Sequence, residues 1–215
     1  MNDKTVLNNC NFIRASLLLL VIIYHSAMYW HGDWFLSSKD NTIPFFYYLT
    51  EWLNSFHIYA LTLVSGFVYA YIKIDKKGYP SFKSLLRSKI SRLIVPYVIV
   101  ALIWVIPNEV YFNGLNFSSI IDYFLLGQRP TQLWFLLMLF GVFVFSYPLT
   151  NLFIEKNWLC FLSIIFLFCV GTLAPINNYF QIKTIFQYML FFWVGAKMYQ
   201  YRNDFLGTPP RVDYS

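Results

Sequence analysis

The stretch FIRASLLLLVIIYHSAMYW, residues 12–30, decides the fold class of this chain. It is long enough to cross the roughly 30 Å hydrocarbon core of a bilayer as one helix. It nevertheless contains Arg14 and His25, two ionisable side chains that are costly at membrane depth. Such residues are retained in spans mainly where they have a function, so the pair marks a candidate site in a membrane protein.

The spacing of Arg14 and His25 places both side chains on one face of a helix. Eleven residues at about 100° each amount to three turns and roughly 20°, and they separate the two positions by about 16 Å along the axis. Arginine is a permanent cation, whereas histidine exchanges a proton near neutral pH. The simpler interpretations are that Arg14 snorkels to the headgroups and that His25 makes an interhelical hydrogen bond.

Composition extends the membrane interpretation to the whole chain. Of its 215 residues, 58% are hydrophobic and only 12% are charged, about half the charged fraction of a soluble domain. Apolar stretches of about 20 residues recur along the sequence, and the alternation typical of a transmembrane barrel is missing. We therefore expect an all-α, polytopic transmembrane helical bundle of about six spans, at residues 12–30, 52–72, 93–111, 133–153, 158–174 and 185–201.

The distribution of basic residues predicts the orientation. The second connection, residues 73–92, contains seven lysines and arginines, and the first connection, residues 31–51, contains one. The positive-inside rule places the second connection and the N-terminus in the cytoplasm, so Arg14 lies near the cytoplasmic face and His25 in the outward half. The net charge of +6 is concentrated in this juxtamembrane segment, which argues against nucleic-acid binding. No metal site is predicted.

The segment SKISRLIVP, residues 88–96, carries a second candidate site. Lys89 and Arg92 are three residues apart, which places them on one side of a helix, and Arg87 adds a third charge. These residues either anchor a span at the cytoplasmic face or form a phosphate-binding cluster, because arginine matches the geometry of phosphate oxygens.

Two further segments contribute candidate residues. In FHIYALTLVSGFVYA, residues 56–70, Ser65 and Gly66 permit close helix contact, and the simple interpretation of His57 is solvation at the interface. In QLWFLLMLFG, residues 132–141, Trp134 is expected at the outer interface. Residues 120–126 are apolar but too few to span the membrane.

Taken in order, RASLLLLVIIYH, FH with SGF, SKISRLIVPY and LWFL resemble the acyltransferase-3 family of integral membrane proteins. The resemblance covers about residues 11–197 and is nearest to the O-acetyltransferases that modify fucose and other surface sugars. It implies transfer of an acyl group, usually acetyl, from cytoplasmic acyl-CoA to a hydroxyl of a cell-surface carbohydrate or its lipid-linked precursor. It also implies a bacterial inner (plasma) membrane location, essential roles for Arg14 and His25, and a cytoplasmic basic motif at Lys89 and Arg92.

The residues and the resemblance lead to one mechanistic expectation. Acyl-CoA (acetyl-CoA) is the expected donor, with its thioester reaching between helices toward His25, which acts as a general base or a nucleophile. By polarity alone, Ser65, Trp134 and Tyr24 are candidate donors to the developing oxyanion. The donor phosphates are expected to rest against the basic side chains at the cytoplasmic mouth, namely Arg14, Arg87, Lys89 and Arg92.

The chain departs from the family pattern in two respects. The family usually has arginine at the position of Lys89, and its members resemble bundles of about ten spans. We therefore expect residues 1–206 to correspond to an N-terminal portion of an acyltransferase-like domain, followed by a polar tail at residues 207–215. The alternatives to an acyltransferase are a non-catalytic truncated remnant and a small-solute transporter, which also places ionisable residues at the midplane.

Overall fold

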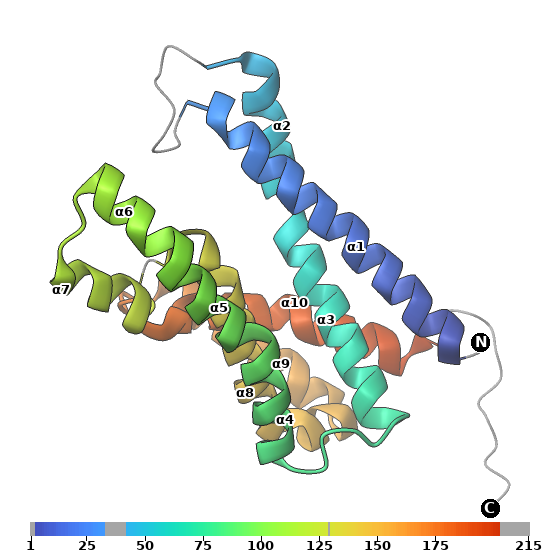
Figure 1. Ribbon diagram of the computed structural model, residues 1–215. Coiled ribbons are helices and arrows are strands. Elements are labelled where there is room, and N and C mark those ends of the chain that lie inside the picture. The colour runs from blue at the N-terminus through green and yellow to red at the C-terminus, as the bar shows by residue number, and fades with distance from the viewer. Residues whose placement is uncertain (1–2, 33–41, 129, 203–215) are drawn as a thin grey trace, which may run out of the picture.

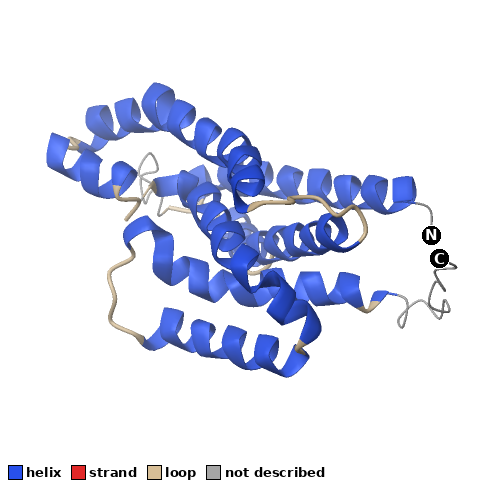
Figure 2. Ribbon diagram, turned by 90° about the horizontal axis from the view of Figure 1, so that it is seen from below, coloured by secondary structure: helices blue, strands red, loops and turns tan. Residues whose placement is uncertain are grey.

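The computed structural model describes residues 3–32, 42–128 and 130–202. Over these residues the regular structure is entirely helical and contains no strand (Figure 1, Figure 2). The α-helices are α1 (Asp3–Ala27), α2 (Pro44–Asn54), α3 (His57–Ile74), α4 (Phe82–Lys89), α5 (Val95–Val100), α6 (Ile106–Asn113), α7 (Phe117–Ile120), α8 (Trp134–Glu155), α9 (Asn157–Leu173) and α10 (Ile182–Gln200).

Several helices join into longer membrane-crossing stretches. Among the described residues, four stretches are long and apolar enough to span a bilayer: Asn8–Trp30, Pro44–Ile74, Phe82–Phe112 and Thr131–Glu155. The remaining two expected spans, at residues 158–174 and 185–201, coincide with the shorter helix α9 and with α10. The prediction of an all-α transmembrane bundle is thus confirmed. The predicted tail at residues 207–215 lies outside the described residues.

Helix α1 presents one face to the protein and the other to its surroundings. Leu17 is buried, and Leu20 and Val21 pack with it against Leu61 and Val64 of α3. The opposite face is apolar but exposed, and includes Phe12, Leu19 and Ile22. In a bilayer that exposed face is in contact with lipid, which is as apolar as leucine. The buried face, which contains Arg14 and His25, is therefore turned toward α3 (Figure 1).

The third membrane-crossing stretch, Phe82–Phe112, contains two wide π-helical turns. They lie at Ile90–Ile94 and Ala101–Val105, and each ends two residues before a proline, Pro96 or Pro107. Proline lacks the backbone N–H and clashes with the carbonyl four residues earlier, so the preceding turn widens. The first turn alters the spacing of Lys89 and Arg92: Lys89 is half-buried and Arg92 is exposed, although an unbroken α-helix would set them on one side.

The centre of the bundle is the crossing of α3 and α10. A Cβ on Gly66 would lie 1.8 Å from the backbone oxygen of Phe192, and a Cβ on Gly195 would lie 1.9 Å from that of Leu63. The two helices thus meet backbone to backbone, as small residues allow in membranes. The expected packing role of Gly66 is confirmed, and α3 is fixed in position by this contact.

A buried polar network joins α8 to the same pair of helices. The indole nitrogen of Trp193 donates to Ser146 Oγ at 3.1 Å, and the Tyr69 hydroxyl is 2.6 Å from Thr150 Oγ1. Because hydrogen bonds fix the relative rotation of packed helices, this network sets the register of α3, α8 and α10. The helical residues Phe117–Ile120 and Ile121–Leu125 pack below the third stretch through Phe124, as expected for a segment too short to span.

The predicted orientation can be tested by cysteine labelling. With the native cysteines replaced by serine, Lys77→Cys is expected to react with membrane-impermeant maleimide only from the cytoplasmic side, and Ser118→Cys only from outside. Both native side chains are exposed and lie in opposite connections. The physical reason is the excess of basic residues in the second connection. Labelling with the sides exchanged would reverse the orientation.

Candidate active site

A cavity of about 280 Å³ lies where α1, α2, α3 and the start of α8 meet. Both His25 and His57 line it, so the structure adds a second imidazole to the one expected from sequence. Its other polar lining residues come from three different elements: Tyr24 from α1, Asn54 from α2, and Thr131, Gln132 and Trp134 at and just before the start of α8.

His25 lies in the last turn of α1, half-buried on the face turned to α3. Its ring packs edge-on against Tyr24, with centroids 5.1 Å apart, and its charge interacts with that of His57. The cavity wall thus carries two imidazoles, and an imidazole can both accept and donate a proton.

His57 is the first residue of α3 and is only 1% exposed, so the expectation that it is solvated at the interface is wrong. Its Nδ1 bonds to the backbone oxygen of Leu53. A carbonyl can only accept, so Nδ1 carries the proton and Nε2 keeps a lone pair. The short break between α2 and α3 turns this ring toward α1, where it lies 5.0 Å from the ring of Tyr24.

The three candidate oxyanion donors have different positions. Tyr24 and Trp134 both line the cavity. Ser65 does not, because it lies two turns along α3 and its hydroxyl donates to the Leu61 backbone oxygen at 2.8 Å. The hydroxyl of Ser65 thus bonds within its own helix. Of the three candidate oxyanion donors, Tyr24 and Trp134 remain.

A cluster of cations lies at the other end of the buried face of α1. The charge of Arg14 interacts with that of Arg92, and Lys89 interacts with both. No ion pair among the described residues involves any of the three. Three like charges without a carboxylate repel one another, so an anion placed among them gains electrostatic stabilisation.

Aromatic rings hold Lys89 in this basic cluster, which we define as Arg14, Lys89 and Arg92. The Lys89 ammonium lies 3.5 Å from the ring centroid of Phe143 and 5.4 Å from that of Tyr79. A cation over a ring face is attracted by the ring quadrupole and gains no counterion from it. The cluster therefore presents its positive charge without an internal counterion.

Arg87 is the one predicted phosphate-binding residue that the structure sets apart. It is exposed on α4, and its charge does not act on Arg14 or Lys89. Sequence proximity suggested a common role for Arg87, Lys89 and Arg92, but the half-buried Lys89 points to Phe143 and Arg87 does not share that environment. We expect it to contribute less to any anion site.

Sequence reasoning did not identify His57, Asn54 and Gln132 as cavity residues. They come from segments up to 107 residues from His25, and no periodicity within one helix connects them. One signal was present for His57, since a histidine four residues after Leu53 can bond back to its carbonyl across a helix break. In the described part of the chain, no group of three or more His, Cys, Asp or Glu side chains is placed to hold a metal.

Comparison with known proteins identifies the family of the chain. No curated protein sequence and no solved structure matches it. The model of the acyltransferase-3 family, described as an acyltransferase domain, matches residues 7–211, which is nearly the whole chain and includes all but the first four residues of α1 and the whole of α2 through α10. The chain, an apolar helical bundle with a histidine-lined cavity, therefore belongs to the acyltransferase-3 family of membrane acyltransferases.

Proposed function

We propose that this membrane acyltransferase moves an acyl group, in the simplest case acetyl, from cytoplasmic acyl-CoA to a hydroxyl of a carbohydrate. One observation carries the proposal: Arg14, a member of the basic cluster, and His25, which lines the cavity, lie on the same half-buried face of α1. Arg14 and His25 are in one continuous helix, so they are about 16 Å apart along its axis. A donor with a charged head and a long arm fits two such positions.

The phosphate-bearing head of acyl-CoA is the group that we expect the basic cluster to bind. Coenzyme A carries several phosphate charges that cannot enter hydrocarbon, and Arg14, Lys89 and Arg92 supply cations without internal counterions. The arginines match phosphate oxygens with paired N–H donors, and Lys89 acts as a point charge. The pantetheine arm then spans the distance between the two positions and delivers the thioester to the cavity.

The cavity supplies the groups needed for transfer. His25 or His57 takes the proton of the acceptor hydroxyl, whose oxygen attacks the thioester carbon. The C–S bond then breaks, the ester forms, and the coenzyme A sulfur leaves as a thiol after receiving the proton. Tyr24 and Trp134 are the lining residues able to donate to the transient oxyanion. The alternative route has two steps: a His25 nitrogen attacks the thioester carbon and the C–S bond breaks, and the acceptor oxygen then attacks the acyl-imidazole, so that the C–N bond breaks as the ester forms.

Acetyl-CoA titration onto the purified chain in lipid nanodiscs tests the donor side. Arg14→Ala and Arg92→Ala are each expected to weaken affinity about ten- to hundredfold, since a charge-assisted hydrogen bond contributes about 1.5–3 kcal/mol. Arg92→Lys should recover part of the loss, and Lys89→Arg should bind as well as the parent or better. Arg87→Ala is the matched control, with little expected change.

A purely topological role for these cations predicts a different pattern. Arg92→Ala would then lower the quantity of inserted protein, while the molecules that insert would bind acetyl-CoA normally. Affinities are therefore expressed per inserted molecule. Unchanged affinity in both Arg14→Ala and Arg92→Ala would refute the donor site.

A further inference from the structure

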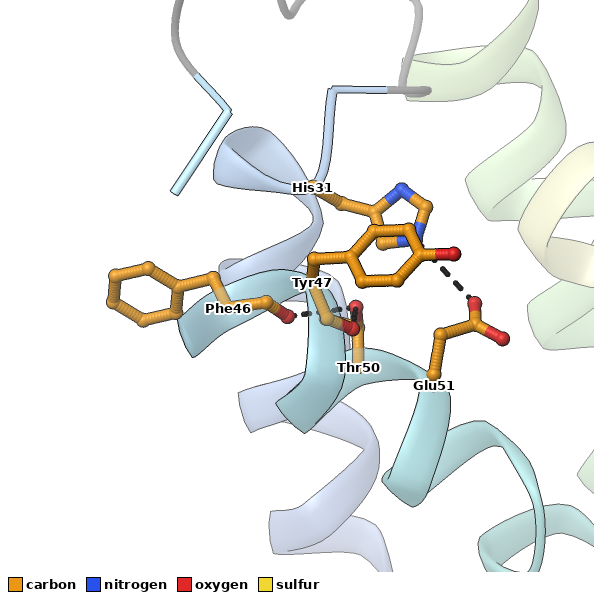
Figure 3. Close-up of polar contacts among 5 residues, drawn as sticks. All are labelled: His31, Phe46, Tyr47, Thr50 and Glu51. Carbon is orange, nitrogen blue, oxygen red and sulfur yellow. Dashed lines mark hydrogen bonds and ion pairs between the residues drawn. The ribbon is translucent and has the colours of Figure 1, made fainter. Parts of the chain in front are cut away.

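A second group of polar side chains, formed by His31, Tyr47 and Glu51, lies one turn beyond the cavity, where the end of α1 meets α2. His31 Nε2 is 3.3 Å from Glu51 Oε1, and the His31 ring stacks on Tyr47 with centroids 4.8 Å apart (Figure 3). The two partners differ in accessibility, because the His31 side chain is 6% exposed and the Glu51 side chain is 56% exposed. The buried imidazole thus holds a carboxylate that faces outward.

This arrangement contributes little to stability by itself. A histidine–carboxylate contact whose carboxylate is 56% exposed stabilises the fold little, because solvent screens it. Thr50, drawn beside Glu51 in Figure 3, donates to the backbone oxygens of Phe46 at 2.8 Å and Tyr47 at 2.9 Å. Its hydroxyl therefore bonds within its own helix, α2. A carboxylate that is held in place and left accessible is suited to binding a ligand.

Helix geometry connects this group to the cavity. Tyr47, Glu51 and Asn54 are spaced by four and three residues on α2, so they share one face of that helix. Asn54 lines the cavity, and the Glu51 charge acts on the hydroxyl of Tyr24, another lining residue. His31 likewise follows the lining residue Met28 by three positions. The group therefore borders the cavity at the end away from the basic cluster.

The chemistry of this face suits a sugar. A fixed carboxylate accepts hydrogen bonds from two neighbouring hydroxyls, an amide both donates and accepts, and an aromatic ring offers a flat apolar surface to a pyranose. The geometry points to Tyr47, Glu51 and Asn54 as the binding site for the acceptor carbohydrate. The inference rests on the proposed function, and it adds the substrate subsite. The negative charge selects neutral sugars and disfavours those that carry a carboxylate.

Direct binding of sugars tests this site without any donor. The full chain in nanodiscs is titrated with a panel of methyl glycosides of neutral hexoses and 6-deoxyhexoses, and saturation-transfer NMR measures their binding. Glu51→Gln keeps an oxygen to accept from His31 but removes the charge, and it should weaken sugar binding about tenfold or more. Tyr47→Leu removes the ring and should act in the same direction. Glu155→Gln, an exposed position at the far end of α8, is the control.

The outcomes separate the acceptor site from the proposed reaction. Sugar binding that is lost in Glu51→Gln and Tyr47→Leu but kept in Glu155→Gln supports the site. The site is overturned if no glycoside of the panel binds the parent chain, or if both variants bind as the parent does. Failure to transfer acetyl from acetyl-CoA, with sugar binding intact, would instead count against the proposed reaction and leave the sugar site standing.

Discussion

Replacing His25 by alanine is expected to lower acetyl transfer by about 10²- to 10⁴-fold, the contribution of a well-placed general acid–base group. The imidazole lines the cavity and lies on the same helix face as Arg14. The rate of transfer from radiolabelled acetyl-CoA, measured in membranes and divided by the quantity of inserted protein, gives the effect. Acetyl-CoA affinity should stay near that of the parent, since Arg14, the proposed contact of the donor phosphates, lies about 16 Å away along α1.

Two other histidines provide the comparison. His57→Ala should also reduce transfer, because its ring lines the same cavity as His25. His31→Ala should leave transfer at saturating acceptor largely intact, since His31 does not line the cavity. It contacts Glu51 and Tyr47 of the proposed acceptor site, so any loss should appear in the KM for the acceptor. Undiminished transfer by His25→Ala would remove the base and nucleophile roles of this residue together.

Gly66→Ala is expected to destabilise the bundle by about 3 kcal/mol, at the upper end of the usual cost of overpacking. The added methyl group would lie 1.8 Å from the backbone oxygen of Phe192, an atom that cannot rotate away. Helices α3 and α10 would have to separate along their central contact. Thermal unfolding of the purified chain in detergent, followed by the loss of helical circular dichroism, measures the change.

Gly141→Ala is the matched control for this prediction. A Cβ there would lie 2.1 Å from Cδ1 of Ile185, the flexible end of a side chain that can adopt another rotamer. We expect a loss of about 1 kcal/mol or less. If Gly66→Ala proves no more damaging than Gly141→Ala, the close backbone contact between α3 and α10 is not what holds the bundle together.

The sequence predicted those features that depend on one helix at a time. Long apolar stretches identified the helices, and the eleven-residue spacing of Arg14 and His25 placed both on one face of α1, which the structure shows to be its half-buried face. The close contact at Gly66 could be predicted because only small residues let helices approach in lipid.

The remainder depends on tertiary structure and was not visible in the sequence. The burial of His57 requires the break between α2 and α3 and the ring of Tyr24 from another helix. The difference in burial between Lys89 and Arg92 depends on the widened turn before Pro96, which a regular helical period does not describe. Sequence proximity groups Arg87 with these two residues, but neighbours in sequence need not share an environment in space, and Arg87 is exposed whereas Lys89 is half-buried.

The backbone contact between α3 and α10 also has a consequence for synthesis. Gly195 follows Gly66 by 129 residues, so at 5–20 residues per second the ribosome needs roughly 6 to 26 seconds to supply the partner. During that interval the face of α3 that contains Gly66 has no α10 to pack against. Nascent chains arrested before α10 emerges should therefore be open to proteases and to wrong helix partners, and resistance should appear abruptly once α10 inserts.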